Sequence, residues 1–550
     1  MKNNHKFKFD IWGIFTLAIL GFYLLFLVLP LGTVLYQAVI NKETGALTFN
    51  YFIKFFSKPY YSSTLWNSFK VSFCTTVLAI AIGAPLAYFF TMFKIKGKKF
   101  LQILIILASM SAPFIGAYSW ILLLGRNGVV TNFFKGIGIA VPPIYGFAGI
   151  LLVLVCQLFP LIFLYIQGAL KNVDNSLIEA SENMGCSGWR LFLKVIVPLV
   201  LPTMLAGGLL VFMRALSDFG TPMLIGEGYR TFPVLIFNEF MSEVSGDDGF
   251  ASAIAIVAIL VTAFIFLIQK FASNRFSFTM NAMHTIEEKQ LKGTSNILVH
   301  LYSYLVIGIA IVPQCYVIYT SFKNTKGLLF TEGYSLMSYK SAFERMGNTI
   351  INTFKIPGIS LILIVLFAVL IAYLVVRRRN SLTNTVDIMS MIPYIIPGSV
   401  VGIAFGITFR NKFFSIGGLA LMVIALIVRR LPYTIRSSVA VLQQIPMSIE
   451  EASISLGASK LKTFFKITVP MMAGGIISGA ILSWVTLISE LSTAIILYTT
   501  KTKTLTISIY TEVLRGNYGI AAALSTVLTV LTVISLLAFM KISNGKDITM

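Results

Sequence analysis

Twelve separate apolar runs divide the 550-residue chain, and each run is long enough to cross a bilayer. Backbone amides and carbonyls can be satisfied in lipid only inside helices or closed barrels. The runs lack the alternation of polar and apolar residues that barrel strands show, so the sequence predicts an all-α integral membrane protein with about twelve transmembrane helices. The predicted spans are 11–39, 67–93, 101–124, 147–170, 198–215, 250–271, 297–320, 349–376, 383–408, 417–442, 470–489 and 517–541.

The basic residues indicate the orientation of these spans. The formal net charge is +22, but compact clusters follow the second span at Lys94–Lys99 and the eighth span at Arg377–Arg379. Cytoplasmic loops of membrane proteins carry such clusters. The sequence therefore predicts a multi-pass protein of the bacterial cytoplasmic (inner) membrane, surrounded by lipid, with both termini in the cytoplasm and no nucleic-acid partner. The basic N-terminus and run 11–39 predict a retained first helix, because that run is too long for a cleaved signal.

A polar block occurs twice in the chain. Glu179–Pro198 recurs at Glu451–Pro470 with a constant offset of 272, and nine of its 20 residues are identical. Asn67–Lys70 recurs as Asn352–Lys355 at an offset of 285. These matches predict two parallel six-helix repeats, because a unit with an even number of spans enters the membrane from the same side each time. The predicted domains are a first repeat at 1–276, a cytoplasmic linker without a functional role at 277–296, and a second repeat at 297–550.

Each copy of the block has the signals of a short isolated helix. A Ser-x-x-Glu spacing predicts a capping box at its start, a glycine predicts a left-handed stop, and a second serine can cap the next helix. These residues are Ser176, Glu179, Gly185 and Ser187 in the first copy and Ser448, Glu451, Gly457 and Ser459 in the second. A helix of about two turns is marginal in water, so we expect another protein to support it. The alternative is an ordinary loop between membrane helices.

The pattern Glu-Ala, then Gly five residues after the Ala, then Pro 13 residues after the Gly resembles the EAA loop of ABC importer permeases, here at 176–198 and 448–470. Ser181 and Ser453 stand where that family usually has a second Ala. The resemblance implies cytoplasmic coupling helices that sit in a cytoplasmic ABC ATPase homodimer, and an extracytoplasmic substrate-binding protein as a second partner. The residues that it implies for ATPase coupling are Ser176, Glu179, Ala180, Gly185, Ser448, Glu451, Ala452 and Gly457.

The chain has no G-x-x-x-x-G-K-[ST] pattern that could cradle phosphates. We therefore expect a translocation subunit without enzymatic activity and without a cofactor of its own. ATP and Mg²⁺ would be used by the partner ATPase. The cysteines Cys74, Cys156, Cys186 and Cys315 are isolated in the sequence, which favours packing roles over a disulfide or metal site.

Two further repeated features are candidates for the translocation path. Asp218 and Thr221 align with Glu490 and Thr493 at the same offset of 272, and acidic groups at membrane depth are costly unless paired, hydrated or liganding. We hypothesise that Asp218 and Glu490 line the path and attract a metal cation. The alternative is a structural pair at the outer interface, with Arg214, Lys501 or Lys503 as partners. Prolines also interrupt the third span of each half, which marks either a substrate route or kinked packing: Pro113 in the first half, and Pro393 and Pro397 in the second.

The solute is the least constrained feature of the sequence. A fused double permease with Asp-Phe-Gly after the first block and Glu-Leu-Ser-Thr after the second is most similar to ferric iron permeases, and a hard cation prefers oxygen ligands. Permeases for phosphonate, polyamine, thiosulfate or sulfate are built similarly and remain open. A twelve-helix secondary transporter is a further alternative, although Lys94–Lys99 lacks the acidic residue expected in that class.

Overall fold

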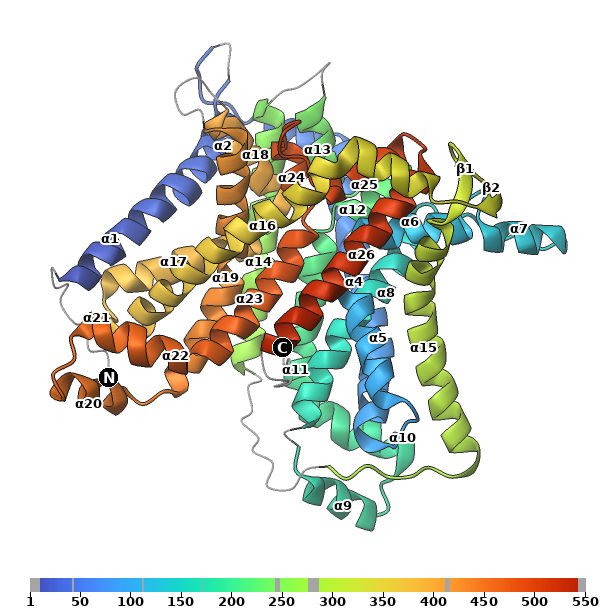
Figure 1. Ribbon diagram of the computed structural model, residues 1–550, viewed down its shortest axis with the longest axis horizontal. Helices are drawn as coiled ribbons and strands as arrows, with labels where there is room; N and C mark the ends of the chain where they lie inside the picture. Colours follow the sequence, from blue (N-terminus) through green and yellow to red (C-terminus); the bar gives the residue numbers. More distant parts are fainter. Residues whose placement is uncertain are drawn as a thin grey trace. The chain divides into compact units, whose positions relative to one another are not determined.

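The computed structural model describes residues 10–41, 44–110, 113–171, 173–242, 248–275, 286–410 and 416–542 (Figure 1). The elements of the first half are α1 (Ile11–Tyr23), η1 (Leu24–Val28), α2 (Leu29–Val39), α3 (Asn50–Ser57), α4 (Pro59–Met92), α5 (Lys98–Met110), α6 (Pro113–Leu124), α7 (Val129–Gly136), α8 (Phe147–Leu170), α9 (Asn175–Asn183), α10 (Gly188–Leu191), η2 (Phe192–Ile196), α11 (Val197–Leu216), α12 (Gly220–Ile225), α13 (Phe232–Met241) and α14 (Asp248–Arg275). Those of the second half are α15 (Gly293–Thr320), β1 (Lys323–Lys326), β2 (Leu329–Tyr334), α16 (Met337–Arg377), α17 (Ser381–Ile395), α18 (Gly398–Phe409), α19 (Gly418–Gln444), α20 (Met447–Ser455), α21 (Lys460–Thr463), η3 (Phe464–Thr468), α22 (Val469–Met471), α23 (Ala473–Ile488), α24 (Ala494–Leu497), α25 (Leu505–Leu514) and α26 (Tyr518–Ile542).

The membrane-spanning character of the chain is confirmed. Within the described ranges, nine helices are long and apolar enough to cross a membrane, or twelve if each of three bent pairs forms one span. The predicted runs 11–39 and 147–170 match Ile11–Val39 and Phe147–Leu170 at both ends. The strands β1 and β2 form one small antiparallel hairpin in which Lys323 pairs with Tyr334. The all-α class is therefore correct apart from this hairpin.

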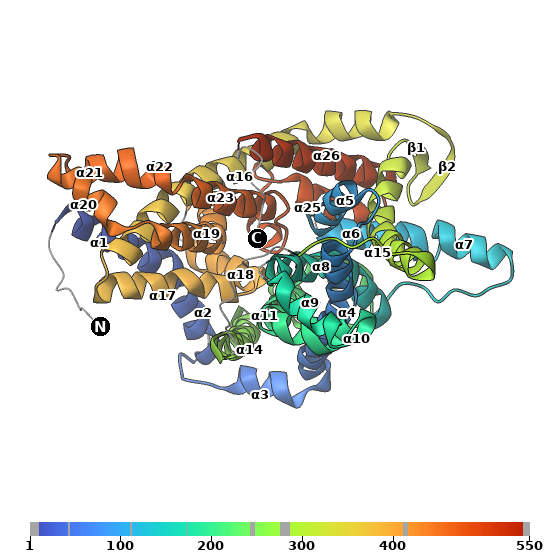
Figure 2. The same cartoon turned by 90° about the horizontal axis from the view of Figure 1, so that it is seen from below.

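The chain folds into two compact units that cut across the predicted repeats. Of the described residues, those within 10–55, 236–259 and 336–542 form unit 1, and those within 56–235 and 260–335 form unit 2. In unit 1, α1 and α2 of the first half pack against α17 and α18 of the second, and α1 runs beside α17 (Figure 2). In unit 2, α15 of the second half packs against α5 and α6 of the first. Each unit thus contains the first span of the other half.

The third span of each half is broken, as its prolines predict. The bend between α17 and α18 is 109°, and Pro397 caps α18 with extended backbone (φ −59°, ψ 146°). In the first half, the helices before and after residues 111–112 differ in direction by 101°. Ser111 and Ala112 lie outside the described residues, and Pro113 begins α6. Proline disfavours helical backbone at the residue before it, which accounts for a break at Pro397.

Small residues set the close packing of the helices in each unit. In unit 2, a Cβ on Gly83 of α4 would lie 2.8 Å from the carbonyl oxygen of Phe159 on α8. In unit 1, a Cβ on Gly475 of α23 would lie 2.8 Å from the carbonyl oxygen of Ser437 on α19. Helices in membranes approach one another at such small residues because lipid gives little hydrophobic driving force between them. These contacts hold the loops described below at the ends of the packed helices.

Candidate coupling and translocation sites

Each polar block forms a short helix that ends as predicted. The helices α9 and α20 contain nine residues each. Gly185 and Gly457 follow them with φ of 82° and 88°. The amide of Cys186 donates to the carbonyl of Ser181, and that of Ala458 donates to the carbonyl of Ser453. These bonds close a glycine stop of the Schellman type in both copies, because glycine adopts positive φ without steric cost.

The predicted capping boxes at Ser176 and Ser448 are wrong. Both helices begin one residue before the serine, and the N-cap positions are Asp174 and Pro446. The Asp174 carboxylate accepts a hydrogen bond from the amide of Ser176 at 3.0 Å, so a capping residue two positions upstream of the serine starts α9. Pro446 has φ −61° and ψ 139° and makes no side-chain cap. Its ring limits φ, which places the start of α20 at the next residue.

The second serine of each block takes the predicted position. Ser187 and Ser459 are the N-cap residues of α10 and α21. The Ser459 hydroxyl accepts a hydrogen bond from the amide of Lys462 at 3.3 Å, whereas the Ser187 side chain makes no capping bond. Prolines 198 and 470 then follow turns of π-helix, η2 and η3, at equivalent places. Proline has no amide hydrogen, so the wider turn satisfies the carbonyls that it leaves free.

The residues predicted to contact an ATPase all lie on the exposed side of these helices or at their ends. Ser176, Glu179, Ala180 and Gly185 are exposed, and so are Ser448, Glu451, Ala452 and Gly457. A further pair was not predicted: Met184 is 80% exposed and Leu456 is 90% exposed. They occupy equivalent positions directly before the two glycines. Two matched apolar side chains in a polar loop are the pattern of a contact surface.

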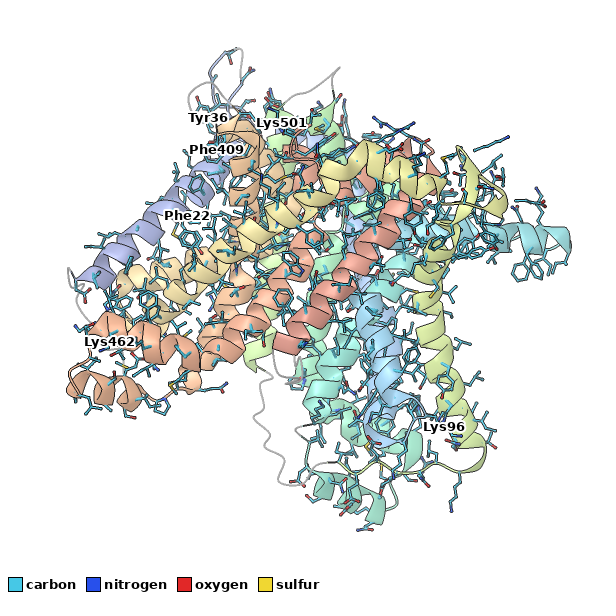
Figure 3. All side chains as sticks on the ribbon, in the orientation of Figure 1. Phe22, Tyr36, Lys96, Phe409, Lys462 and Lys501 are labelled. Atoms are coloured by element: carbon cyan, nitrogen blue, oxygen red, sulfur yellow. The ribbon has the colours of Figure 1, made fainter. Side chains whose placement is uncertain are left out.

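A basic cluster lies beside α9 and another beside α20. In unit 1, Arg377 at the end of α16 binds Glu450 of α20 through its Nε at 2.8 Å, and the Tyr373 hydroxyl donates to the same carboxylate at 3.2 Å. In unit 2, the Lys94–Lys99 turn lies at the same end as α9, and Figure 3 labels Lys96 there and Lys462 beside α20. Lys501 lies at the opposite end of unit 1 from Lys462 (Figure 3). Within each unit, the short repeated helix therefore lies at the same end as a basic cluster.

Glu490 is buried in a network that the sequence did not reveal. Both carboxylate oxygens are bound, one by Arg429 and one by Arg430, two neighbouring residues of α19. The Ser492 hydroxyl and the Thr493 amide donate to Glu490 Oε1 at 2.9 and 3.0 Å. Neither Lys501 nor Lys503, the partners considered from sequence, forms this pair. Because two guanidinium groups already bind the carboxylate, it has little capacity left to bind a cation directly.

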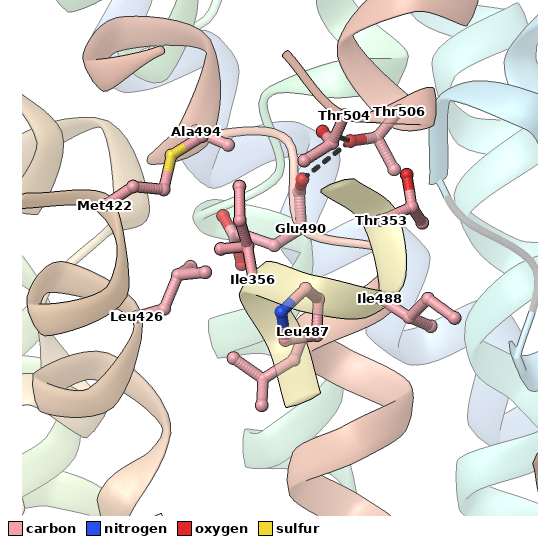
Figure 4. A pocket seen from close by; sticks show the side chains of 11 residues that line it. Thr353, Ile356, Met422, Leu426, Leu487, Ile488, Glu490, Ala494, Thr504 and Thr506 are labelled. Carbon is pink, nitrogen blue, oxygen red and sulfur yellow. Dashed lines mark hydrogen bonds between the residues drawn. The ribbon is translucent and has the colours of Figure 1, made fainter. Parts of the chain in front are cut away.

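The Glu490 loop lies against the broken third span of its half. The Thr493 hydroxyl donates to the carbonyl of Gly398, at the start of α18, at 3.0 Å. A Cβ on Gly398 would clash with Arg429 and with Ser492. Three of the predicted path residues, Glu490, Thr493 and Pro397, are thus brought into one region. A small pocket lies beside them, with Glu490 and Thr353 among its lining residues, and Thr506 donates to the carbonyl of Glu490 there (Figure 4).

Asp218 has a different environment from Glu490. Its carboxylate accepts a hydrogen bond from the Thr221 amide at 3.0 Å, and no cationic side chain among the described residues forms an ion pair with it. The positions of Arg429 and Arg430 are held by Gln157 and Leu158 in the first half. Gly220, between Asp218 and Thr221, lies against Phe114 of α6, so this loop also packs on the broken third span. Only one of the two acidic residues is therefore neutralised within its own unit.

The side chains around Asp218 and Glu490 do not form a recognisable metal site within the described part of the chain. Among residues that the structure describes, no group of three or more His, Cys, Asp and Glu side chains is arranged to hold a metal ion. A role for Asp218 and Glu490 in attracting a metal cation stays a prediction. Pro393 lies buried within α17, four residues before Pro397, and its role in the path also stays a prediction.

An asparagine that recurs in both halves binds a distant loop in each half, and these contacts were not predicted from the sequence. The Asn67 side chain donates to the carbonyl of Arg230 at 3.0 Å, and Asn352 donates to the carbonyl of Lys501 at 2.9 Å. The hydroxyl of the next residue in each copy, Ser68 or Thr353, accepts a hydrogen bond from the amide of the first residue of α13 or of α25. The match between Asn67–Lys70 and Asn352–Lys355 was the available signal, but it gave no indication of the partners, which lie 163 and 149 residues further along the chain.

Comparison with known proteins identifies the family. The model of the binding-protein-dependent transport system inner membrane component family matches the chain twice, at residues 79–278 and 364–545. The chain belongs to this family. It is a fused permease that carries two copies of the family's domain, in agreement with the repeats deduced from its sequence.

Permeases that are named for different solutes are similar to this chain. A ferric transport system permease protein FbpB of Actinobacillus pleuropneumoniae is 27% identical over 97% of this chain and 78% of its own length. A Fe(3+)-transport system permease protein of Haemophilus influenzae is 24% identical over 88% and 90%. The spermidine/putrescine permease PotB of H. influenzae is 29% identical over 46% and 91%. A chain of the bacterial alginate ABC transporter in complex with its periplasmic protein covers 48% of this permease at 17% identity and a TM-score of 0.41.

Proposed function

We propose that this permease imports ferric iron, delivered by an extracytoplasmic binding protein and driven by a cytoplasmic ABC ATPase homodimer. The choice of solute rests on how much of this chain each relative matches. The ferric relatives match 97% and 88% of the chain, across both halves, whereas the polyamine relative matches 46%. Asp218, a carboxylate without an ion-pair partner among the described residues, supplies an oxygen donor of the kind that a hard cation prefers. Phosphonate and polyamine remain the competing solutes.

The ATPase contact is proposed at α9 and α20. Both helices end on a glycine stop, and both expose an apolar side chain directly before it, Met184 or Leu456. Two equivalent contact surfaces suit a partner with two equivalent subunits. Hydrolysis of ATP, with its Mg²⁺, belongs to that partner. The basic clusters beside α9 and α20 support a cytoplasmic location for both helices and for both chain termini.

The ATPase contact is tested by charge insertion. Met184→Asp and Leu456→Asp should each weaken copurification of the ATPase by about tenfold or more, because loss of a central interface anchor costs about 2 kcal/mol or more, and about 1.4 kcal/mol is already tenfold. Asn183→Asp adds the same charge at an exposed neighbouring position and is the matched control. Equal ATPase recovery with all three variants would contradict the assignment.

The solute is tested by uptake. Proteoliposomes that contain the permease and the ATPase should accumulate radioactive iron when the binding protein is supplied with ferric ion and ATP. Spermidine and 2-aminoethylphosphonate, each with the same binding protein, are the comparison solutes. Uptake of either one, without iron uptake, would replace the ferric assignment and leave the importer class intact.

A further inference from the structure

The two coupling helices carry the same two residue types in opposite order. Ile178 and Glu182 of α9 correspond to Glu450 and Ile454 of α20 at the offset of 272. Positions four residues apart lie on the same face of a helix. Besides the matched glutamate, Glu179 or Glu451, each helix has a second carboxylate, and it sits one turn later in α9 than in α20. The two helices therefore present this carboxylate to different surroundings.

The attachment of α20 is direct. Glu450 is buried and binds Arg377 at the end of α16, with side-chain exposures of 3% and 8%. In α9 the equivalent position is Ile178, which is buried in an apolar cluster that also contains Met92, the counterpart of Arg377. Because Ile178 attaches α9 through apolar packing, the Glu182 carboxylate can bind a different element.

That element is the segment that joins the two halves. Lys289 binds Glu182 through its ammonium group, with side-chain exposures of 41% and 31%. The Lys289 amide donates to the carbonyl of Met92 at 2.8 Å, and the Lys94 amide donates to the carbonyl of Lys289 at 3.1 Å. The backbone of Lys289 thus forms a parallel bridge with Phe93, directly after α4. Its side chain is presented to α9 from a fixed backbone.

Neighbouring residues fix the same segment on both sides of Lys289. Ile286 and Leu291 pack against the apolar core of unit 2. Glu288 forms an ion pair with Lys98, at the start of α5. Residues 286–292 are therefore integrated into unit 2, and the expectation that the linker has no role does not account for these contacts. Residues 276–285 lie outside the described residues and have no part in the inference.

We propose that residues 286–292 form a strap that positions α9 for the ATPase, and that Lys289 binding Glu182 is its positioning contact. The inference rests on the proposed function, because α9 must be a docking helix. A nine-residue helix is marginal on its own, so its orientation depends on such supports. Movement of the ATPase is then passed from α20 to α16 through the ion pair of Glu450 and Arg377. From α9 it is passed to α4 and α5 through the apolar packing of Ile178 and, in addition, through the strap, a segment that exists because the two repeats share one chain.

The test uses the full-length permease with its ATPase and binding protein in proteoliposomes. Glu182→Gln and Lys289→Met should each raise the ATPase concentration needed for half-maximal transport about two- to fivefold, the size expected for a partly exposed ion pair. They should also lower the amount of solute moved per ATP hydrolysed. The charge exchange Glu182→Lys with Lys289→Glu should restore both quantities. Lys292→Met changes an exposed lysine three residues further on and should leave both unchanged.

Ionic strength separates a positioning contact from a general loss of folding. The difference between the wild type and Glu182→Gln should shrink as salt is raised, because salt screens exposed charges. Wild-type behaviour of both single variants, or impaired singles without rescue by the charge exchange, would overturn the strap. Failure of the proposed function itself gives a different result, because the wild-type chain would then not bind the ATPase at all.

Discussion

Arg377 and Glu450 form a buried ion pair at the two positions that Met92 and Ile178 occupy in the other half of the chain. The guanidinium also donates to the carbonyl of Ile445 at 2.7 Å, so both the charge and the hydrogen-bonding capacity of the pair are used. The positions that join α16 to α20 are thus ionic, whereas the equivalent positions on α4 and α9 are apolar and lie in one core cluster.

The first half supplies a template for replacing this pair. Arg377→Met alone should destabilise the permease by about 3–5 kcal/mol, because it leaves the Glu450 carboxylate buried without its partner. Arg377→Met combined with Glu450→Ile recreates the Met92 and Ile178 arrangement and should recover most of that loss, since well-packed apolar residues often replace a buried pair without cost. Thermal unfolding in detergent measures both. A double variant as unstable as the single variant would contradict the equivalence of the two junctions.

The glycine stops give a second prediction. Gly185→Ala and Gly457→Ala should each cost about 1–2 kcal/mol, because a left-handed residue with a Cβ is strained even where space is available, and nothing lies within 4 Å of a Cβ added at either position. Asparagine should cost less than alanine at both positions. Gly168→Ala is the control, since that glycine is helical and also has open space around it. The alanine variants should unfold at a lower temperature and recover less ATPase than the asparagine variants. The reverse order would contradict a left-handed glycine at the end of each helix.

The presence of the long membrane helices and the ends of α9 and α20 were predictable from the sequence, because both depend on local signals. The lengths of apolar runs located Ile11–Val39 and Phe147–Leu170, and glycine located the ends of α9 and α20. The helix starts were misplaced, because Asp174 is also a good N-cap residue and its carboxylate binds the amide of Ser176, and the Ser-x-x-Glu pattern alone does not decide between the two starts.

Long-range pairing was not predictable from the sequence. Glu490 binds Arg429 and Arg430, about 60 residues earlier in the chain, and the first half gives no guide because Gln157 and Leu158 replace both arginines. For a similar reason, the sequence did not predict that the first span of each half packs against helices of the other half. Repeats identify equivalent segments, but they do not indicate which copy a segment packs against.

Adjacent glycines of α23 give a matched pair of substitutions. A Cβ on Gly475 would lie 2.6 Å from Val441 Cγ2 and 2.8 Å from the Ser437 carbonyl oxygen, whereas nothing lies within 4 Å of a Cβ on Gly474. Gly475→Ala should therefore cost about 1–3 kcal/mol through overpacking of α23 against α19. Gly474→Ala should be neutral or slightly stabilising, because alanine favours helix. Thermal unfolding of the two variants is the measurement, and equal midpoints would place the α19–α23 contact elsewhere.

The two acidic residues of the repeated loops should respond differently to neutralisation. Glu490→Gln leaves two buried guanidinium groups without their carboxylate and should destabilise the permease by about 3–5 kcal/mol. Asp218→Asn keeps an acceptor for the Thr221 amide and removes no ion pair found among the described residues, so its effect on unfolding should stay within about 1 kcal/mol. If Asp218 attracts the cation, iron uptake by Asp218→Asn should nevertheless fall by about tenfold at unchanged protein yield. Normal uptake by this stable variant would remove Asp218 from the path, and the restored carboxylate of Asp218→Glu controls for side-chain size, since it should retain more uptake than the amide does.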